Sequence, residues 1–399
     1  WALEVQVEME SITIGGMANG FGMETNSHVS GLFQETVVRY ELVVPDGSVV
    51  VATREENADL FYAVPWACGT VGFLTAVTAR IVRVKTFVHI TYVPTYSRQE
   101  LCEKMCELSQ KADPPYFLEA TVYSKDTAVI QVGEFVDVVS AEQRGMVNPI
   151  NHFWRPFYFR WVETFIEKKG GEEIIPLKHY YHRFTRSIFW ELEDMIPFSN
   201  HPLYRCLWGW MGPPEVSFLK VSQGPVIRKA SVYAHAVQES ILPVSRLAEG
   251  VEKFDEWYGC YPLLAFPVRI YDRGEHSGML NPKGRNLKPG ENWGIWVDLG
   301  VYGVPRNVKN GKPWDAKQTV RTMEHWTREI GGFQACYTDI FCTPKEFRQM
   351  FDHTLLDRVR LKYGATDAFP EVYEKVKSEP GIVDLTEELK AEQRGDQNY

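Results

Sequence analysis

The chain has 399 residues, 44% hydrophobic and 24% charged, as is usual for a globular protein of two domains or of one domain with large insertions. A net charge of −9 without a basic stripe argues against a nucleic-acid partner. The seven cysteines form no C-x-x-C pair, so we expect reduced thiols in a cytosol-facing protein and no metal site. No apolar run reaches the ~18 residues of a membrane span, and the chain start at Trp1 is typical of a domain interior rather than a signal peptide.

The first feature along the chain is a glycine-rich segment, SITIGGMANGFGMETNSHVSGLF, over residues 11–33. Within eight positions it carries four glycines, Gly15, Gly16, Gly20 and Gly22. Glycine tolerates positive φ and lets the backbone approach a ligand closely, so such a cluster after the β-type run Ile12–Ile14 suggests N–H groups directed at phosphates. A tight turn at a domain edge is the alternative. A Rossmann G-x-G-x-x-G motif is excluded, because Thr25 stands where the third glycine is needed.

The following fifty residues predict α/β structure. Two β-branched runs, Arg39–Val44 and Ser48–Thr53, flank the turn residues Pro45-Asp46-Gly47 and predict a hairpin. The spacing of Thr53 and Glu56 predicts a helix start. Alternation over Phe73–Val82 predicts a further strand.

Residues 85–342 alternate between strand and helix patterns. The predicted strands are Thr91–Pro94, Phe117–Tyr123, Ala128–Val132 and Ile295–Val301. The predicted helices are Glu100–Lys111 and Ala316–Ile330. Beyond about Ser378 the chain is highly charged, and we expect a frayed tail there.

An ordered series of motifs runs through the first 73 residues: TIGG at 13–16, Gly20, Gly22, Gly31, DGS at 46–48, NADLF at 57–61 and GTVGF at 69–73. In order and spacing it resembles the second half of the FAD-binding domain of the vanillyl-alcohol-oxidase, or PCMH, type. The resemblance implies an α/β (α+β) fold in which FAD lies between two subdomains, the first of which would precede Trp1. It also implies that FAD is held mainly by the backbone of one segment, comprising Thr13, Ile14, Gly15, Gly16, Met17, Ala18, Asn19, Gly20, Phe21, Gly22, Met23, Glu24 and Thr25.

The same resemblance predicts the domain organisation. Residues 1–84 would form the second half of the FAD-binding domain, and residues 85–342 an α/β cap or substrate domain. Residues 343–378 would return to the FAD domain, and residues 379–399 would form a charged tail.

Three further stretches narrow the family. The strings LFYAVPWACGTVGFL (60–74), YYHRFTRSIFWELEDMIPF (180–198) and DAFPEVYEKV (367–376) resemble the Δ24-sterol reductases. The resemblance implies an FAD enzyme that reduces the C24=C25 double bond of a sterol side chain with NADPH as the ultimate reductant. It also implies residence in the endoplasmic reticulum membrane, through an N-terminal segment upstream of this chain.

Reduction of an isolated alkene requires a hydride on one carbon and a proton on the other, in a site that excludes water. The string around Tyr180–Arg183 carries the densest group of proton-handling side chains in the central region, and we predict Tyr181 or His182 as the proton donor. In the alternative interpretation, the nearby charges form a solvated or salt-bridged helix face over an aromatic core; they are Arg183, Arg186, Glu191 and Glu193.

Two aromatic patches, Phe153–Trp161 and Tyr204–Met211, suit either a buried core or a membrane-interfacial surface. The function also has alternatives. The same fold could oxidise an alcohol or a hydroxy acid with a flavin, or the chain could bind a sterol or a protein partner without catalysis.

Overall fold

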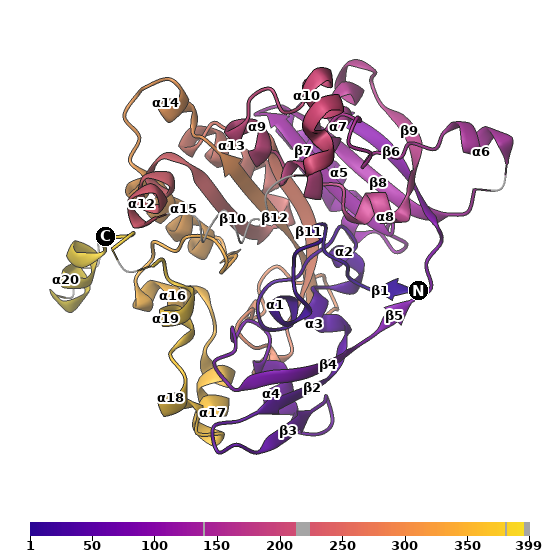
Figure 1. The fold of residues 1–399 in the computed structure, drawn as a ribbon. Helices are drawn as coiled ribbons and strands as arrows, with labels where there is room; N and C mark the ends of the chain where they lie inside the picture. Colours follow the sequence, from indigo (N-terminus) through magenta and orange to yellow (C-terminus); the bar gives the residue numbers. More distant parts are fainter. Residues whose placement is uncertain (139, 213–223, 380, 395–399) are drawn as a thin grey trace.

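An eight-stranded antiparallel sheet forms the middle of the protein, and the whole is a mixed α/β structure of the α+β kind (Figure 1). The computed structural model describes residues 1–138, 140–212, 224–379 and 381–394. The strand order of the large sheet is β13-β10-β12-β11-β7-β8-β6-β9, and two smaller sheets have the orders β3-β2-β4 and β1-β5. No helix among the described residues is long and apolar enough to cross a membrane.

The strands are β1 (Ala2–Leu3), β2 (Val37–Val43), β3 (Val49–Ala52), β4 (Phe73–Ala79), β5 (Ile81–Val82), β6 (Phe87–Thr95), β7 (Phe117–Ser124), β8 (Thr127–Val136), β9 (Gly171–Pro176), β10 (Ala236–Pro243), β11 (Leu263–Tyr271), β12 (Trp293–Gly303) and β13 (Phe333–Gln334). The helices of the first two thirds are α1 (Ile14–Asn19), α2 (Ser27–Ser30), α3 (Phe33–Thr36), α4 (Ala58–Ala63), α5 (Arg98–Gln110), α6 (Ala141–Gly145), α7 (Tyr158–Glu167), α8 (Leu177–Tyr181), α9 (Glu191–Met195), α10 (Pro202–Trp208), α12 (Pro225–Ala234) and α13 (Leu247–Trp257). The remaining helices are α14 (Arg306–Lys309), α15 (Ala316–Glu329), α16 (Pro344–Met350), α17 (Thr354–Lys362), α18 (Ala365–Ala368), α19 (Val372–Val376) and α20 (Thr386–Arg394). Short 3-10 turns are η1 (Thr185–Ser187), η2 (Gly209–Met211), η3 (Val244–Arg246) and η4 (Gly274–His276).

The large sheet has two different buried faces, because successive side chains of a strand point to opposite sides. In β7, Leu118, Ala120 and Val122 join the core beneath α5, α13 and α15. The intervening residues of β7 point to the other face, which is turned toward the first third of the chain and includes the buried polar side chains of Glu119 and Thr121. This second face holds the candidate site.

The predicted hairpin is confirmed: β2 pairs with β3 from Tyr40↔Ala52 to Val43↔Val49, around the turn at Asp46-Gly47. The predicted helix start at Thr53 is wrong. The Thr53 hydroxyl accepts hydrogen bonds from the N–H groups of Glu55 (3.2 Å) and Glu56 (2.9 Å), which closes a turn, and α4 begins only at Ala58. Asn57 lies between them with a φ of 51°, a left-handed conformation that prevents one continuous helix.

The C-terminal helices pack against the first third of the chain. Lys362 of α17 pairs with Asp59 of α4 at 2.8 Å, and Arg360 donates to the carbonyl of Thr70 at 2.6 Å. The rings of Phe73 and Phe369 are 5.6 Å apart. Residues 1–79 and 354–376 therefore form one packed region below the large sheet (Figure 1).

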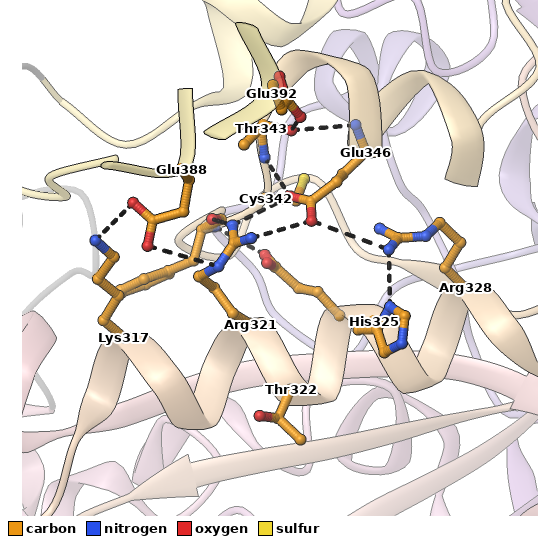
Figure 2. A network of polar contacts seen from close by, with 12 residues as sticks. Lys317, Arg321, Thr322, His325, Arg328, Cys342, Thr343, Glu346, Glu388 and Glu392 are labelled. Atoms are coloured by element: carbon orange, nitrogen blue, oxygen red, sulfur yellow. Dashed lines mark hydrogen bonds and ion pairs between the residues drawn. The ribbon is translucent and has the colours of Figure 1, made fainter. Parts of the chain in front are cut away.

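The expectation of a frayed tail is wrong for residues 386–394, which form α20. Figure 2 shows how polar contacts hold this helix against α15 and the loop before α16. Lys317 of α15 contacts Glu388 at 2.8 Å, and the Thr343 hydroxyl donates to Glu392. Arg321, also on α15, binds Glu346 of α16 at 3.0 Å. The charged residues of this C-terminal segment thus form specific ion pairs with α15 and are not simply solvated.

Candidate functional site

The glycine-rich segment is partly helical. The Thr13 hydroxyl accepts a hydrogen bond from the N–H of Gly16 at 3.1 Å and caps α1. The four clustered glycines all have negative φ, so a left-handed backbone is not the reason for them. A side chain at Gly22 would bring its Cβ within 2.8 Å of Met17 and 2.9 Å of Phe33, so this glycine is required by internal packing. Gly15 differs: it is exposed, and nothing lies within 4 Å of the position that a Cβ would take.

The residues predicted to hold FAD divide into two groups. The side chains of Met23, Glu24 and Thr25 are buried within the protein, as are Met17 and Ala18 of α1. Thr13–Gly16 are exposed, and Asn19–Phe21 are half-buried. If the segment contacts a cofactor, Thr13–Gly16 and Asn19–Phe21 offer the accessible surface, and the role of all these residues stays a prediction.

The structure brings the two predicted site segments together, although they are far apart in the sequence. The hydroxyls of Thr25 and Tyr180 are 2.9 Å apart, and Arg183 binds Glu24 at 2.9 Å. The same guanidinium binds Glu119 of β7 through two hydrogen bonds of 3.0 and 3.2 Å. Arg183 is therefore neither solvated nor on an exposed helix face; its side chain and both carboxylates are fully buried.

Tyr181 and His182 lie beside this ion pair. Tyr181 is 7% exposed, and burial raises the pKa of its hydroxyl well above the usual value. His182 is half-buried, its Nε2 lies 4.0 Å from Glu10 Oε1, and its carbonyl accepts a hydrogen bond from the Asn151 amide at 2.9 Å. Burial lowers the pKa of His182, which favours the neutral imidazole. Neither side chain is excluded as a proton donor by its position, and the assignment stays a prediction.

A group of buried carboxyls that the sequence prediction missed lies next to the Arg183 ion pair. Glu239 of β10 and Asp298 of β12 point to the same face of the large sheet, since Ile241 pairs with Asp298 and Glu239 is two residues from Ile241. Glu8 lies close enough to interact electrostatically with Glu239 and Asp298. All three are at most 9% exposed. We call Glu8, Glu239 and Asp298 the acid cluster.

Burial decides the protonation of the acid cluster. Loss of water and the charge of Glu24 raise the pKa of Glu8 to about 8. Burial and the neighbouring Asp298 raise the pKa of Glu239 well above the usual range, and burial also raises that of Asp298. The single buried arginine of this region, Arg183, already binds Glu24 and Glu119. The acid cluster therefore holds at least one proton at neutral pH, as a general acid must.

Two tyrosines border the acid cluster, and one of them, Tyr337, also contacts the glycine-rich segment. The Tyr302 hydroxyl donates a hydrogen bond to Glu239. Burial of its hydroxyl and the charge of Glu239 raise the pKa of Tyr337 well above the usual value, although 55% of Tyr337 is exposed. The Tyr337 ring lies 5.8 Å from that of Phe21, within the predicted FAD segment. Tyr337 thus leads from the protein surface to the buried carboxyls.

One sequence signal pointed to the acid cluster. Asp298 interrupts the otherwise apolar run that predicts the strand Ile295–Val301, and an unpaired charge in a buried strand is costly unless it has a role or a partner. Glu239 gave no such signal, because β10 itself was not predicted.

Comparison with known proteins gives the family. No family model matches the chain. The chain is 41% identical over 377 residues to the Delta(24)-sterol reductase of Macaca fascicularis, a match that covers 94% of this chain and 70% of the relative. It is 35% identical over 387 residues to the Delta(24)-sterol reductase homolog dhcr-24 of Caenorhabditis elegans, covering 94% of this chain and 71% of that protein. It is 33% identical over 394 residues to the Delta(24)-sterol reductase of Arabidopsis thaliana, covering 94% and 69%. Because these animal and plant relatives are 33–41% identical over 94% of this chain, and the match covers 69–71% of each of them, the chain belongs to the Δ24-sterol reductase family.

Proposed function

We propose that this protein reduces the C24=C25 double bond of a sterol side chain, with FAD as cofactor and NADPH as the ultimate electron donor. The observation that carries the proposal is the likeness to named Δ24-sterol reductases over 94% of the chain. The proposal includes a PCMH-type FAD-binding fold, of which residues 1–84 and 343–378 would be a part, and a location at the endoplasmic reticulum membrane.

The exposed part of the glycine-rich segment fits a large planar cofactor. Gly15 leaves its backbone open to a ligand, and Ile12 and Ile14 beside it expose 42% and 49% of their surface. The half-exposed ring of Tyr337 lies beside Phe21 of the same segment. Apolar side chains around an accessible backbone suit a flat aromatic ring system joined to a polar chain. In this proposal Thr13–Gly16, Phe21 and Tyr337 would contact FAD.

The chemistry that bound FAD would supply is delivery of a hydride to one alkene carbon. The protein must then provide a proton for the other carbon, keep it near the alkene and exclude water. The acid cluster meets the first requirement, because burial keeps a proton on it at pH 7. Once the proton has left, the resulting carboxylate must be reprotonated from solvent, and the half-exposed Tyr337 next to Glu239 gives a route.

Two sets of residues therefore compete for the role of donor to the alkene. Tyr181 and His182 are the predicted donors, and they lie on the Arg183 side of the site. The acid cluster lies on the Tyr337 side and can act through the Tyr337 hydroxyl. Under either assignment Arg183 is a positioning residue, which fixes Glu24 and Tyr180 through hydrogen bonds.

The test is to combine the protein with FAD, NADPH and desmosterol, a sterol with a C24=C25 double bond, and to analyse the sterols by mass spectrometry. The expected product is two mass units heavier, from one hydride and one proton. Flavin absorbance of the repurified protein is a separate measurement. Bound flavin without sterol reduction would favour oxidation of an alcohol or hydroxy acid, whereas no bound flavin would favour a chain that binds a sterol or protein without catalysis.

A further inference from the structure

A cleft lies where α3 and α4 meet the end of β11 and the segment that follows it (Figure 1). We call it the boundary cleft, because it separates the packed region of residues 1–79 and 354–376 from the large sheet. Its empty space, with the open mouth included, is ≈ 560 Å³. The polar lining includes Gln34, Arg54 and Trp66 on one side and Arg269 and Arg273 on the other. None of these residues belongs to the predicted FAD segment or to the acid cluster.

Three side chains that line the boundary cleft carry buried polar atoms without a hydrogen-bond partner among the described residues. They are the indole N–H of Trp66, the Nε–H of Arg269 and the Oε1 of Gln34. Trp66 is 2% exposed and Gln34 is 8% exposed. Buried polar groups nearly always have a partner, because leaving one unpaired is costly. A ligand that satisfies these three groups must accept two hydrogen bonds and donate one.

Trp66 is held in an unusual conformation. Its φ of 65° is left-handed, which is uncommon for a bulky residue and is concentrated at functional sites. The centre of its ring lies 5.6 Å from that of Phe21 and 5.7 Å from that of Phe351. These neighbours fix the plane of the indole, so its N–H is presented in one direction.

The boundary cleft carries an excess of positive charge, in a chain with a net charge of −9. Three arginines line it, and Glu35 is the single carboxylate among the lining residues. Glu35 is bound by Arg273 and so leaves the charges of Arg54 and Arg269 uncompensated. Asp272, next to the lining, accepts the N–H groups of the following turns at 2.9 and 2.7 Å. The charge of the cleft therefore favours an anion.

Arg269 is placed to bind an oxyanion. Its Cζ lies 4.0 Å from the ring centre of Trp293, and its side chain forms no ion pair or hydrogen bond with the described residues. A guanidinium that stacks on an aromatic ring keeps the N–H groups at its edge available, and these match two oxygens of one oxyanion. Arg54, at the mouth of the cleft, is exposed and adds a second positive charge.

A phosphate group meets these requirements. Its oxygens can accept from Arg269 and Trp66, and inorganic phosphate carries an O–H that can donate to Gln34. In a nucleotide, a sugar hydroxyl beside the phosphate can take the place of that O–H. A carboxylate would satisfy the two donors, but it has no hydrogen for the Gln34 oxygen.

We propose that the boundary cleft binds a phosphate group through Arg269 and Trp66, with Arg54 at its mouth. Two sources have this chemistry: free inorganic phosphate, and the phosphates of NADPH. In the first case the site goes beyond the proposed function. In the second it rests on the proposed function, to which it adds residues that hold the electron donor.

The test is isothermal titration calorimetry of the 399-residue chain with inorganic phosphate and, separately, with adenosine 2′,5′-bisphosphate. The second compound carries the phosphates of the adenosine half of NADPH and has no nicotinamide. Arg269→Leu removes the cation, and Trp66→Phe removes the indole N–H but keeps an aromatic ring. The matched control is Arg83→Leu, because Arg83 is exposed and its Cζ lies 5.5 Å from the ring centre of Trp1, outside the cleft.

We expect the wild type and Arg83→Leu to bind phosphate equally, and Arg269→Leu and Trp66→Phe to bind it about tenfold more weakly or worse. The urea midpoint of each variant shows whether it is folded. If Trp66→Phe is destabilised, Arg54→Gln replaces it in the test, because this side chain is exposed; the expected loss is roughly twofold to fivefold. Binding of the bisphosphate about tenfold tighter than that of phosphate would identify NADPH as the source, and equal or weaker binding would identify free phosphate.

Three results would overturn the proposal. The wild type binds neither compound, or Arg269→Leu binds as tightly as Arg83→Leu, or Arg269→Leu has a lower flavin content than Arg83→Leu. The last result would make the cleft a part of the FAD surface. Reduction of desmosterol is measured separately, and a wild type that binds phosphate without reducing desmosterol would contradict the proposed function alone.

Discussion

Arg183 allows a quantitative test of how the buried site is held together. Its guanidinium donates to Glu119 at 3.0 and 3.2 Å, to Glu24 at 2.9 Å and to the carbonyl of Tyr180 at 2.9 Å, and no part of its side chain is exposed. Arg183→Met keeps most of the volume but leaves two carboxylates buried without their cation. Removing one member of a buried ion pair costs about 3–5 kcal/mol, a large share of the ~5–15 kcal/mol by which domains are stable.

Urea unfolding followed by tryptophan fluorescence measures this loss. Arg183→Met/Glu24→Gln/Glu119→Gln should recover most of it at pH 7, because the buried charges are then removed together with their partner. Arg160→Met is the control: that arginine is 42% exposed in its ion pairs, so its loss should cost less than about 1 kcal/mol. A change below about 1 kcal/mol for Arg183→Met, or a triple variant no more stable than the single one, would refute this account of the site.

Three further predictions follow from the same region. The pKa of Glu8 is raised from 4.5 to about 8, so the stabilisation from protonated Glu8 is complete below about pH 4.5 and is lost as the pH rises through 8. The urea midpoint of unfolding should therefore fall between these pH values, and the fall should be smaller in Glu8→Gln. Glu239→Gln should slow the reoxidation of reduced flavin by the sterol by ~10²–10⁴-fold, as rapid mixing would measure, and should leave the reduction of the flavin by NADPH unchanged. If only Tyr181→Phe or His182→Gln slows the reoxidation in this way, the proton donor lies in α8 or at its C-terminus instead. Gly15→Val should lower the flavin content of the protein without changing the urea midpoint of unfolding. Gly22→Val should lower the urea midpoint itself, because the valine side chain would overlap Met17 and Phe33. Equal flavin content in the wild type and Gly15→Val would contradict the proposed cofactor surface.

The elements that were predicted correctly are those whose pattern is local. The strands β7, β8 and β12 contain the predicted Phe117–Tyr123, Ala128–Val132 and Ile295–Val301, and α15 begins at the predicted Ala316. The three strands are rich in β-branched, aliphatic and aromatic residues, which favour strands. In α15 the buried residues Val320, Met323 and Thr327 recur every three to four positions. The strands β1, β9, β10, β11 and β13 were missed. In β10 the polar residues Gln238, Glu239 and Ser240 interrupt the apolar residues although all three are buried, so the sequence does not have the composition of a strand.

The sequence allowed candidate site residues to be selected only where they are adjacent in the chain, and their roles stay predictions. The string Tyr180–Arg183 was selected as a cluster, and the structure places it against Glu24 and Thr25 of the glycine-rich segment. Its partner Glu24 lies 159 residues away, and no spacing rule relates the two. The acid cluster joins Glu8 with two strands of the large sheet, so it exists only once the sheet register is known. The contacts of α20 could not be predicted for the same reason. A charged C-terminal segment is expected to be exposed to solvent unless its ion-pair partners on α15 are known.

The pairing of β1 with β5 has a consequence for how the protein can be assembled. Ala2 pairs with Val82, and Leu3 pairs with Ile81. The start of the chain therefore lies beside the point at which the chain leaves the region of residues 1–79 and continues to β6 (Figure 1). A segment whose two ends meet in this way can be exchanged, duplicated or inserted elsewhere without distorting its neighbours. Any polypeptide joined ahead of Trp1 would emerge at the junction with the large sheet. It would be covalently tethered there, and its local concentration would not depend on binding from solution.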